Sequence, residues 1–213
     1  MSDRPSEGHR SRRDEYAEQT RDAVLTSARA LFAERGYFAT TVNEIAAASR
    51  VSPGTVYQQC GGKQGLLRKL MDVWTTSELV QGTLDVVGAA GSLDQLLNAL
   101  ADSYLEFWRR YDDIVQLVLA TAAHDTAAAE ALAEATVRHR TALYEIARSV
   151  RRLGGFGDSL TDEAFADITL YHYGPQSGFH FTVTVLGWPE DKARDFIGAQ
   201  FARSLDDIAG RTD

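Results

Sequence analysis

The most constraining feature of the sequence is a pair of short helix signals separated by a three-residue turn. The Thr41–Glu44 stretch is a capping-box pattern and predicts a helix over residues 42–48. Ser52-Pro53 combines a helix N-cap with a proline at the first helical position and predicts a second helix that ends near Gln59. Two helices joined by so short a turn are typical of a helix-turn-helix.

Helical patterns continue through most of the chain, so the predicted fold class is all-α. Residues 1–13 are predicted to be a disordered arm. Apolar residues at spacings of three and four then predict a helix that ends at Gly36. With the helix-turn-helix it makes an N-terminal three-helix domain over residues 14–62, and a larger helical domain follows over residues 63–213.

Within the larger domain, the glycine-rich residues 82–91 are predicted to be a loop. A helix interrupted at a Gly-Pro pair is predicted over residues 161–187, and a last helix begins at Pro189. Residues 181–186 have the composition of a strand, but the sequence offers no partner strand, so we expect them to be helical.

Composition and charge narrow the class of protein. With 44% hydrophobic and 24% charged residues the chain is an ordinary folded protein, and its single cysteine, Cys60, excludes an internal disulfide framework. No long apolar run predicts a membrane span and no apolar N-terminal core predicts a secretory signal, so a cytoplasmic protein is expected. The net charge of −8 argues against nucleic acid as a partner, yet residues 1–69 carry 11 Lys/Arg against 8 Asp/Glu.

Residues 21–70 resemble the DNA-binding domain of the TetR family of tetracycline-repressor-like regulators. Four stretches carry the resemblance in order: residues 30–37, 40–46 and 51–57, then Lys63 with the Leu66-Leu67 pair. Three positions depart from the family pattern: Arg50 stands where the turn usually has a glycine, Cys60 where an aromatic residue is frequent, and Gln64 where an acid is usual. A non-glycine residue in the left-handed region costs about 1 kcal/mol, so either the turn is strained or Arg50 adopts another geometry.

We expect the second helix of the motif to be the recognition helix, because the N-terminal end of such a helix faces base edges in the major groove. Gln58 and Gln59 are the best base readers, since an amide can pair bidentately with adenine. Tyr57 is expected to contact phosphate, although it could belong to the core, and Lys63 is expected to grip phosphate. The full set of DNA-binding candidates is Thr40, Thr41, Arg50, Ser52, Pro53, Gly54, Thr55, Tyr57, Gln58, Gln59 and Lys63. Whether the arginine-rich arm touches DNA stays open.

The larger domain is expected to bind a small molecule and to form a homodimer, as the family resemblance also implies. Aromatic and polar groups on apolar stripes suit an apolar or aromatic effector. The ligand candidates are Tyr104, Trp108, Tyr111, His139, Tyr144, His172, Tyr173, Phe179 and His180, although aromatic residues at helical spacing can also be core. The dimer candidates are Phe181, Val185, Ile197, Phe201, Leu205 and Ile208. A twofold dimer would place two recognition helices on a pseudo-palindromic operator.

The functional prediction is therefore a transcriptional regulator, in the first instance a repressor, that binds double-stranded DNA and is released by its effector. No cofactor, metal or membrane partner is expected. One alternative is a DNA-binding factor without an effector. The other is a helical enzyme or metal protein built on histidines such as His172 and His180, but they lack ligand spacing and Pro175 lies between them.

Overall fold

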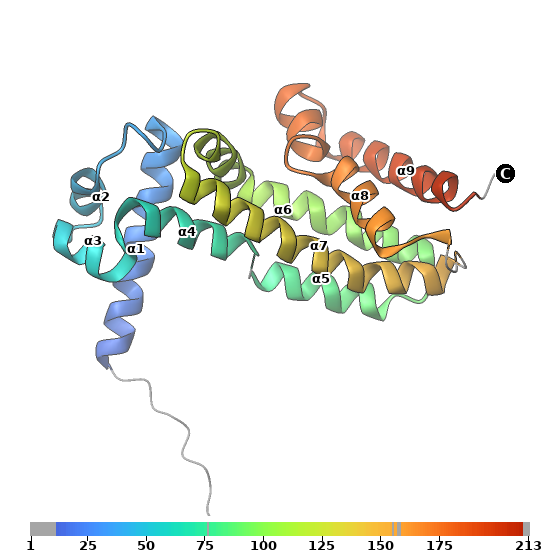
Figure 1. Cartoon of the computed structure of the whole chain (residues 1–213), viewed down its shortest axis with the longest axis horizontal. Coiled ribbons are helices and arrows are strands. Elements are labelled where there is room, and N and C mark those ends of the chain that lie inside the picture. The colour runs from blue at the N-terminus through green and yellow to red at the C-terminus, as the bar shows by residue number, and fades with distance from the viewer. Residues whose placement is uncertain (1–11, 76, 155, 157–158, 211–213) are drawn as a thin grey trace, which may run out of the picture. The chain divides into compact units, whose positions relative to one another are not determined.

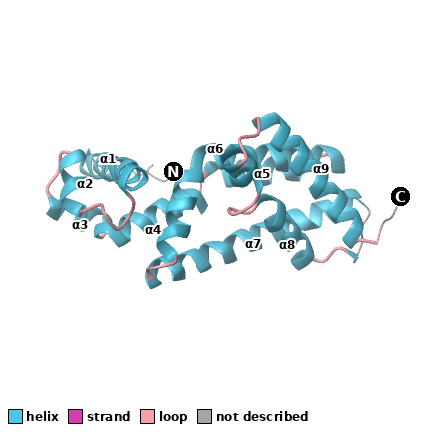
Figure 2. Ribbon diagram, turned by 90° about the horizontal axis from the view of Figure 1, so that it is seen from above, coloured by secondary structure: helices cyan, strands magenta, loops and turns pink. Residues whose placement is uncertain are grey.

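The structure is a computed structural model that describes residues 12–75, 77–154, 156 and 159–210. In this part of the chain every regular element is a helix, as Figures 1 and 2 show. The chain divides into two compact units, one up to Leu70 and one from Met71 onward. The all-α prediction is therefore confirmed, and each unit is described by itself.

The N-terminal unit is built from α1 (Arg12–Arg35), α2 (Val42–Ala48), α3 (Pro53–Cys60) and the first part of α4 (Gly62–Thr75). Its core gathers apolar side chains from each helix, among them Val24, Phe32, Ile45, Val56 and Leu66. The helix that was expected to follow an arm of 13 residues begins at Arg12, and residues 1–11 lie outside the described residues.

The turn between α2 and α3 has the local geometry that the sequence predicts. Thr41 caps α2: its hydroxyl accepts a hydrogen bond from the backbone N–H of Glu44 at 3.3 Å, and the Glu44 carboxylate accepts one from the Thr41 backbone N–H at 2.8 Å. Ser52 caps α3 ahead of Pro53. Arg50 has a φ of 58°, so the turn keeps its left-handed conformation without a glycine and carries the strain that goes with it.

The second unit contains α5 (Glu78–Ala89), α6 (Leu93–Ala122), α7 (Thr126–Gly154), α8 (Asp162–Tyr173), the π-helix η2 (His180–Val185) and α9 (Glu190–Ile208). Helix α6 packs against α5, α7 and α9, and α8 packs against α7 and α9. The helical prediction for residues 181–186 is confirmed by η2. In a π-helix each backbone hydrogen bond spans five residues, where an α-helix spans four.

The predicted loop over residues 82–91 is wrong, because α5 continues through it to Ala89. Gly82 and Gly88 each reduce the stability of a helix by about 1 kcal/mol relative to alanine. The burial of Thr83 and Val87 against the rest of the unit offsets that cost. A local glycine signal was overridden by tertiary packing.

Three predicted dimer residues belong instead to the unit's own core. Ile197, Phe201 and Leu205 are 4%, 0% and 1% exposed, since that side of α9 packs on α6 and α8. The other three predicted dimer residues are on the surface: Phe181, Val185 and Ile208 are 47%, 58% and 50% exposed. An apolar stripe predicted burial of α9 correctly, but it did not show that the covering helices come from the same chain.

Candidate nucleic-acid interface and ligand cavity

Helix α3 presents one continuous face to solvent. Val56 and Cys60 fix the opposite face in the core of the N-terminal unit. The exposed positions recur about one helical turn apart, first at the N-cap and first turn and then in the middle of the helix. They are Ser52, Pro53, Gly54, Tyr57 and Gln58. Pro53 has no backbone N–H and the Thr55 N–H is bonded to the Ser52 hydroxyl, so the attraction of this end for anions comes from the positive end of the helix dipole and the polar side chains.

Two side chains of α3 differ in how freely they can reach a partner. Gln58 is exposed. Gln59 is half-buried, and its side-chain amide oxygen accepts a hydrogen bond of 3.4 Å from the guanidinium of Arg21 on α1. Gln58 is therefore the better placed base reader of the two, a distinction that the adjacent sequence positions could not show.

The neighbouring threonines Thr40 and Thr41 also differ in exposure to solvent. Thr40 is 1% exposed, and its hydroxyl donates to the backbone carbonyls of Gly36 at 2.9 Å and Leu31 at 3.3 Å. Its side chain ties the loop before α2 to α1 and is not available to DNA, contrary to the expectation that placed Thr40 among the DNA-binding candidates. Thr41 is exposed at the start of α2 and serves as its cap.

Basic groups border the α3 face. Arg50 is exposed in the turn. The ammonium of Lys63, at the start of α4, lies 4.4 Å from the centroid of the Tyr37 ring, a cation–π contact that holds it in place. The pKa of Lys63 is lowered, because the cost of partial burial outweighs the opposing effect of the nearby Glu44 carboxylate. The Thr41 backbone N–H, in turn, lowers the pKa of Glu44 and keeps that carboxylate occupied at the cap.

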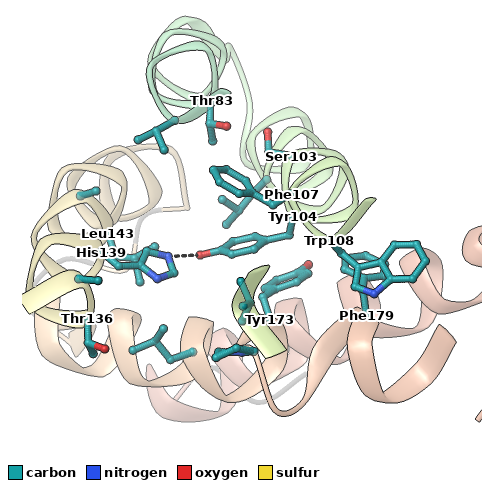
Figure 3. A pocket seen from close by; sticks show the side chains of 18 of the residues that line it. Thr83, Ser103, Tyr104, Phe107, Trp108, Thr136, His139, Leu143, Tyr173 and Phe179 are labelled. Carbon is teal, nitrogen blue, oxygen red and sulfur yellow. Dashed lines mark hydrogen bonds between the residues drawn. The ribbon is translucent and has the colours of Figure 1, made fainter. Parts of the chain in front are cut away.

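The second unit holds a cavity of about 350 Å³ (Figure 3). Six of the nine predicted ligand residues line it: Tyr104, Trp108, His139, Tyr173, Phe179 and His180. The cavity therefore lies between α6, α7, α8 and the segment that leads into η2, and it is walled mainly by apolar groups.

At the centre of the cavity wall the Tyr104 hydroxyl and His139 Nε2 are 2.9 Å apart, which joins α6 to α7 (Figure 3). Burial lowers the pKa of His139 to about 4, so the imidazole is neutral at pH 7. Burial likewise raises the pKa of Tyr104 far above its ordinary range, so the phenol is neutral too. The polar pair in the cavity thus carries no charge.

Three predicted ligand residues lie elsewhere in the described part of the second unit. His172 shares a hydrogen bond of 2.9 Å with the Ser204 hydroxyl on α9. Tyr111 packs its ring against Phe107 with 5.8 Å between centroids, and Tyr144 packs against the core. Helical spacing identified the apolar face of each helix, but it does not show which part of that face borders empty space.

Other lining residues were missed by the sequence reasoning. Asp112 lies eight residues after Tyr104 on the same side of α6, so spacing could have found it; both of its carboxylate oxygens lie 3.0 Å from His180 Nδ1. Val80 and Thr83 come from α5. No signal pointed to them, because Thr83 fell in the loop predicted over residues 82–91 and Val80 lies just before it.

The comparisons with known proteins agree with this division of the molecule. Residues 24–70 match the family model described as bacterial regulatory proteins, tetR family. The HTH-type transcriptional repressor Rv3405c of Mycobacterium tuberculosis (strain ATCC 25618 / H37Rv) is 30% identical over 114 residues, which are 47% of this chain and 58% of that repressor. The HTH-type transcriptional regulator HbdR of Aromatoleum sp. (strain CIB) is 40% identical over 50 residues, which are 24% of this chain and 22% of that regulator.

Solved structures extend the likeness to most of the chain. A TetR-family transcriptional regulator from Syntrophomonas wolfei str. Goettingen superposes with a TM-score of 0.72 at 15% identity, covering 88% of this chain and 96% of that one. SmeT, in a complex with triclosan, superposes with a TM-score of 0.64 at 18% identity over 90% of each chain. At these identities the likeness shows a shared fold.

Fold and surface together define a helix-turn-helix domain joined to a larger helical domain that contains a cavity. Residues 24–70 match the tetR family of bacterial regulatory proteins, and most of the chain shares the fold of TetR-family structures.

Proposed function

We propose that the chain is a transcriptional repressor that binds a pseudo-palindromic DNA operator as a homodimer and is released by a small apolar or aromatic effector. It acts in the cytoplasm and needs no catalytic group. The described residues contain no helix long and apolar enough to cross a membrane. Among the same residues, no three His, Cys, Asp or Glu side chains gather as a metal site would require.

The observation that carries the proposal is the exposed face of α3 in a domain that matches the TetR family. Tyr57 is 60% exposed, so its phenol is available to a partner and is not held in the core. Gln58 is exposed beside it. A polar face on a short helix, with basic residues on both sides, suits insertion into a major groove, where side chains meet base edges while the cations contact phosphates.

The homodimer is supported by apolar surface on the last helices. Phe181, Val185 and Ile208 are joined there by three further exposed apolar side chains, namely Tyr171, Leu186 and Phe196. Exposed apolar side chains gathered on the last elements of the fold suit a protein interaction site. A second copy of the chain is the proposed partner, because a twofold pair would present two α3 helices to the two halves of an operator.

Release by an effector is supported by the cavity, whose walls are mostly aromatic and aliphatic. Helix α4 connects the DNA-binding unit to the unit that holds the cavity, so a change around the cavity could be transmitted along it. Effector binding and operator binding must then weaken each other by the same factor. If a bound effector left the operator affinity unchanged, this part of the proposal would fail.

Selection of binding sites from a random duplex library tests the DNA-binding proposal. The full chain should enrich an inverted repeat whose half-sites are about 10 base pairs apart or a multiple of that spacing. A Gln58→Ala variant should relax the preference at one position of each half-site, and Gln64→Ala, an exposed position beyond α3, should leave it unchanged. Absence of any enriched sequence would refute DNA reading by α3.

Lys63→Ala tests the phosphate contact on the selected site. Removal of one phosphate contact weakens binding across sequences and lowers the slope of log affinity against log salt by about one. The measurement is a fluorescence anisotropy titration at several salt concentrations. An unchanged slope would remove Lys63 from the DNA interface.

A further inference from the structure

Most polar groups that line the cavity are committed to bonds within the protein; the exceptions are the Trp108 indole N–H and the Tyr173 hydroxyl, which are buried without a hydrogen-bond partner among the described residues. The hydroxyls of Thr83, Ser103 and Thr136 each donate to a carbonyl of their own helix, at 2.7, 2.8 and 2.9 Å. Each therefore has lone pairs left and no proton to offer to a ligand.

The charged side chains of the wall are matched as well. Asp112 lies 3.0 Å from His180 Nδ1, and Arg138 lies 4.0 Å from Asp72. The side chains of Arg138 and Asp72 are 46% and 56% exposed, so their charges are solvated, and the Asp112 carboxylate would repel a ligand carboxylate in the cavity. Since an unpaired charge is costly to bury, the wall favours an uncharged ligand.

The shape of the site favours a flat ring. The Tyr104 and Tyr173 rings are stacked, with centroids 4.6 Å apart and planes within 8°, and their hydroxyls lie at opposite ends of the stack (Figure 3). Phe107 tilts against Tyr104 with centroids 6.5 Å apart. A planar aromatic ligand can add to such a set of ring faces and edges.

The Tyr104–His139 pair keeps one hydrogen-bonding position for a ligand. If Tyr104 donates to His139 Nε2, the phenol oxygen can still accept a bond; if Nε2 donates, the phenol O–H is left as a donor. A ligand hydroxyl can donate or accept, so it fits both arrangements. A ketone or an ether fits only the second.

We propose that the effector is an uncharged aromatic molecule that carries a hydroxyl group, and that Tyr104 forms the hydrogen bond to that hydroxyl and so sets the specificity of the cavity. This inference rests on the proposed effector function. It names the chemical class of the effector and the residue that selects it.

Three matched probes test the class: 2-naphthol, 2-methylnaphthalene and 2-naphthoate, titrated into the full chain by calorimetry or ligand fluorescence. We expect 2-naphthol to bind about fivefold more tightly than 2-methylnaphthalene, the effect of one neutral hydrogen bond. The carboxylate should bind at least about tenfold more weakly than 2-naphthol. Equal binding of the first two probes, tightest binding of the carboxylate, or no binding of any probe would overturn the proposal.

The role of Tyr104 is tested with Tyr104→Phe, which keeps the ring and removes the hydroxyl. The advantage of 2-naphthol over 2-methylnaphthalene should disappear in this variant, while 2-methylnaphthalene binds as before. Tyr111→Phe, the matched control, removes a phenol hydroxyl from the same helix outside the cavity lining and should retain the advantage. An advantage that persists in Tyr104→Phe, or that vanishes in Tyr111→Phe, contradicts the assignment.

The wild-type probe series stands even if Tyr104→Phe does not fold. Site selection on DNA without any probe reports on the proposed DNA binding separately. If DNA binding holds and the naphthol preference fails, only the class of effector is wrong.

Discussion

Burial of His139 in the cavity wall predicts a specific dependence of stability on pH. The pKa of His139 is about 4 in the folded chain, against 6.5 for an ordinary histidine, because burial disfavours the imidazolium. Between these two pH values the unfolded chain binds a proton that the folded chain does not. The contribution of His139 is therefore fully present above pH 6.5 and is lost as the pH falls towards 4.

The size of this effect follows from the two pKa values. Each pKa unit corresponds to about 1.4 kcal/mol, so the gap amounts to about 3 kcal/mol across that pH range. His139→Gln removes the titration, and the glutamine can still accept a hydrogen bond from Tyr104. The free energy of unfolding of this variant should fall by about 3 kcal/mol less than that of the wild type between pH 6.5 and 4.

The assay is urea unfolding followed by tryptophan fluorescence over a pH series. All three tryptophans lie after residue 70, so the signal reports the unit that holds the cavity. Burial also lowers the pKa of His172, and hydrogen bonds lower the pKa of Glu44, so the comparison must be the difference between variant and wild type. Parallel pH profiles for the two proteins would refute the argument that His139 is buried and neutral.

The remaining predictions concern packing and assembly. Gly65→Ala should destabilise the N-terminal unit by about 1–3 kcal/mol in urea unfolding followed by circular dichroism, because the new methyl group would overlap the backbone carbonyl of Cys60. Gly82→Ala, a helical glycine facing open space, should instead stabilise its unit by about 0.5–1 kcal/mol, and the reverse order would contradict the packing described. Arg50→Gly should relieve left-handed strain of about 1–2 kcal/mol at an entropic cost of about 0.5–1, so a clear loss of stability would argue against strain in this turn. Phe181→Asp should shift sedimentation towards the monomer, while Val137→Asp, a change at an exposed apolar residue of α7, should not. A monomeric wild type, or a Phe181→Asp variant that stays dimeric, would exclude this face from the dimer.

Local chemistry was the most predictable part of this molecule. The capping box at Thr41, the cap at Ser52 and the left-handed turn at Gly36 depend on residues within one helical turn, and each appears in the structure. Arg50 shows the limit of such reasoning, because sequence alone left two geometries open and only the surrounding helices decide that the strained one is kept.

Distant packing could not be predicted in the same way. Phe181 and Phe201 both lie on apolar stripes, yet one is 47% exposed and the other 0%. A stripe shows that a helix face will be covered, and it does not say by which partner. The same holds for the cavity, where Tyr104 lines the empty space and Tyr144 packs against the core.

The central claim is that α3 enters the major groove of DNA, and methylation protection by dimethyl sulfate tests it most directly. The reagent modifies N7 of guanine in the major groove and N3 of adenine in the minor groove, so one experiment distinguishes the two grooves. On a duplex selected by the full chain, we predict protection of guanine N7 in two patches about one helical turn apart. Protection confined to adenine N3, or none at all on a bound duplex, would contradict the claim.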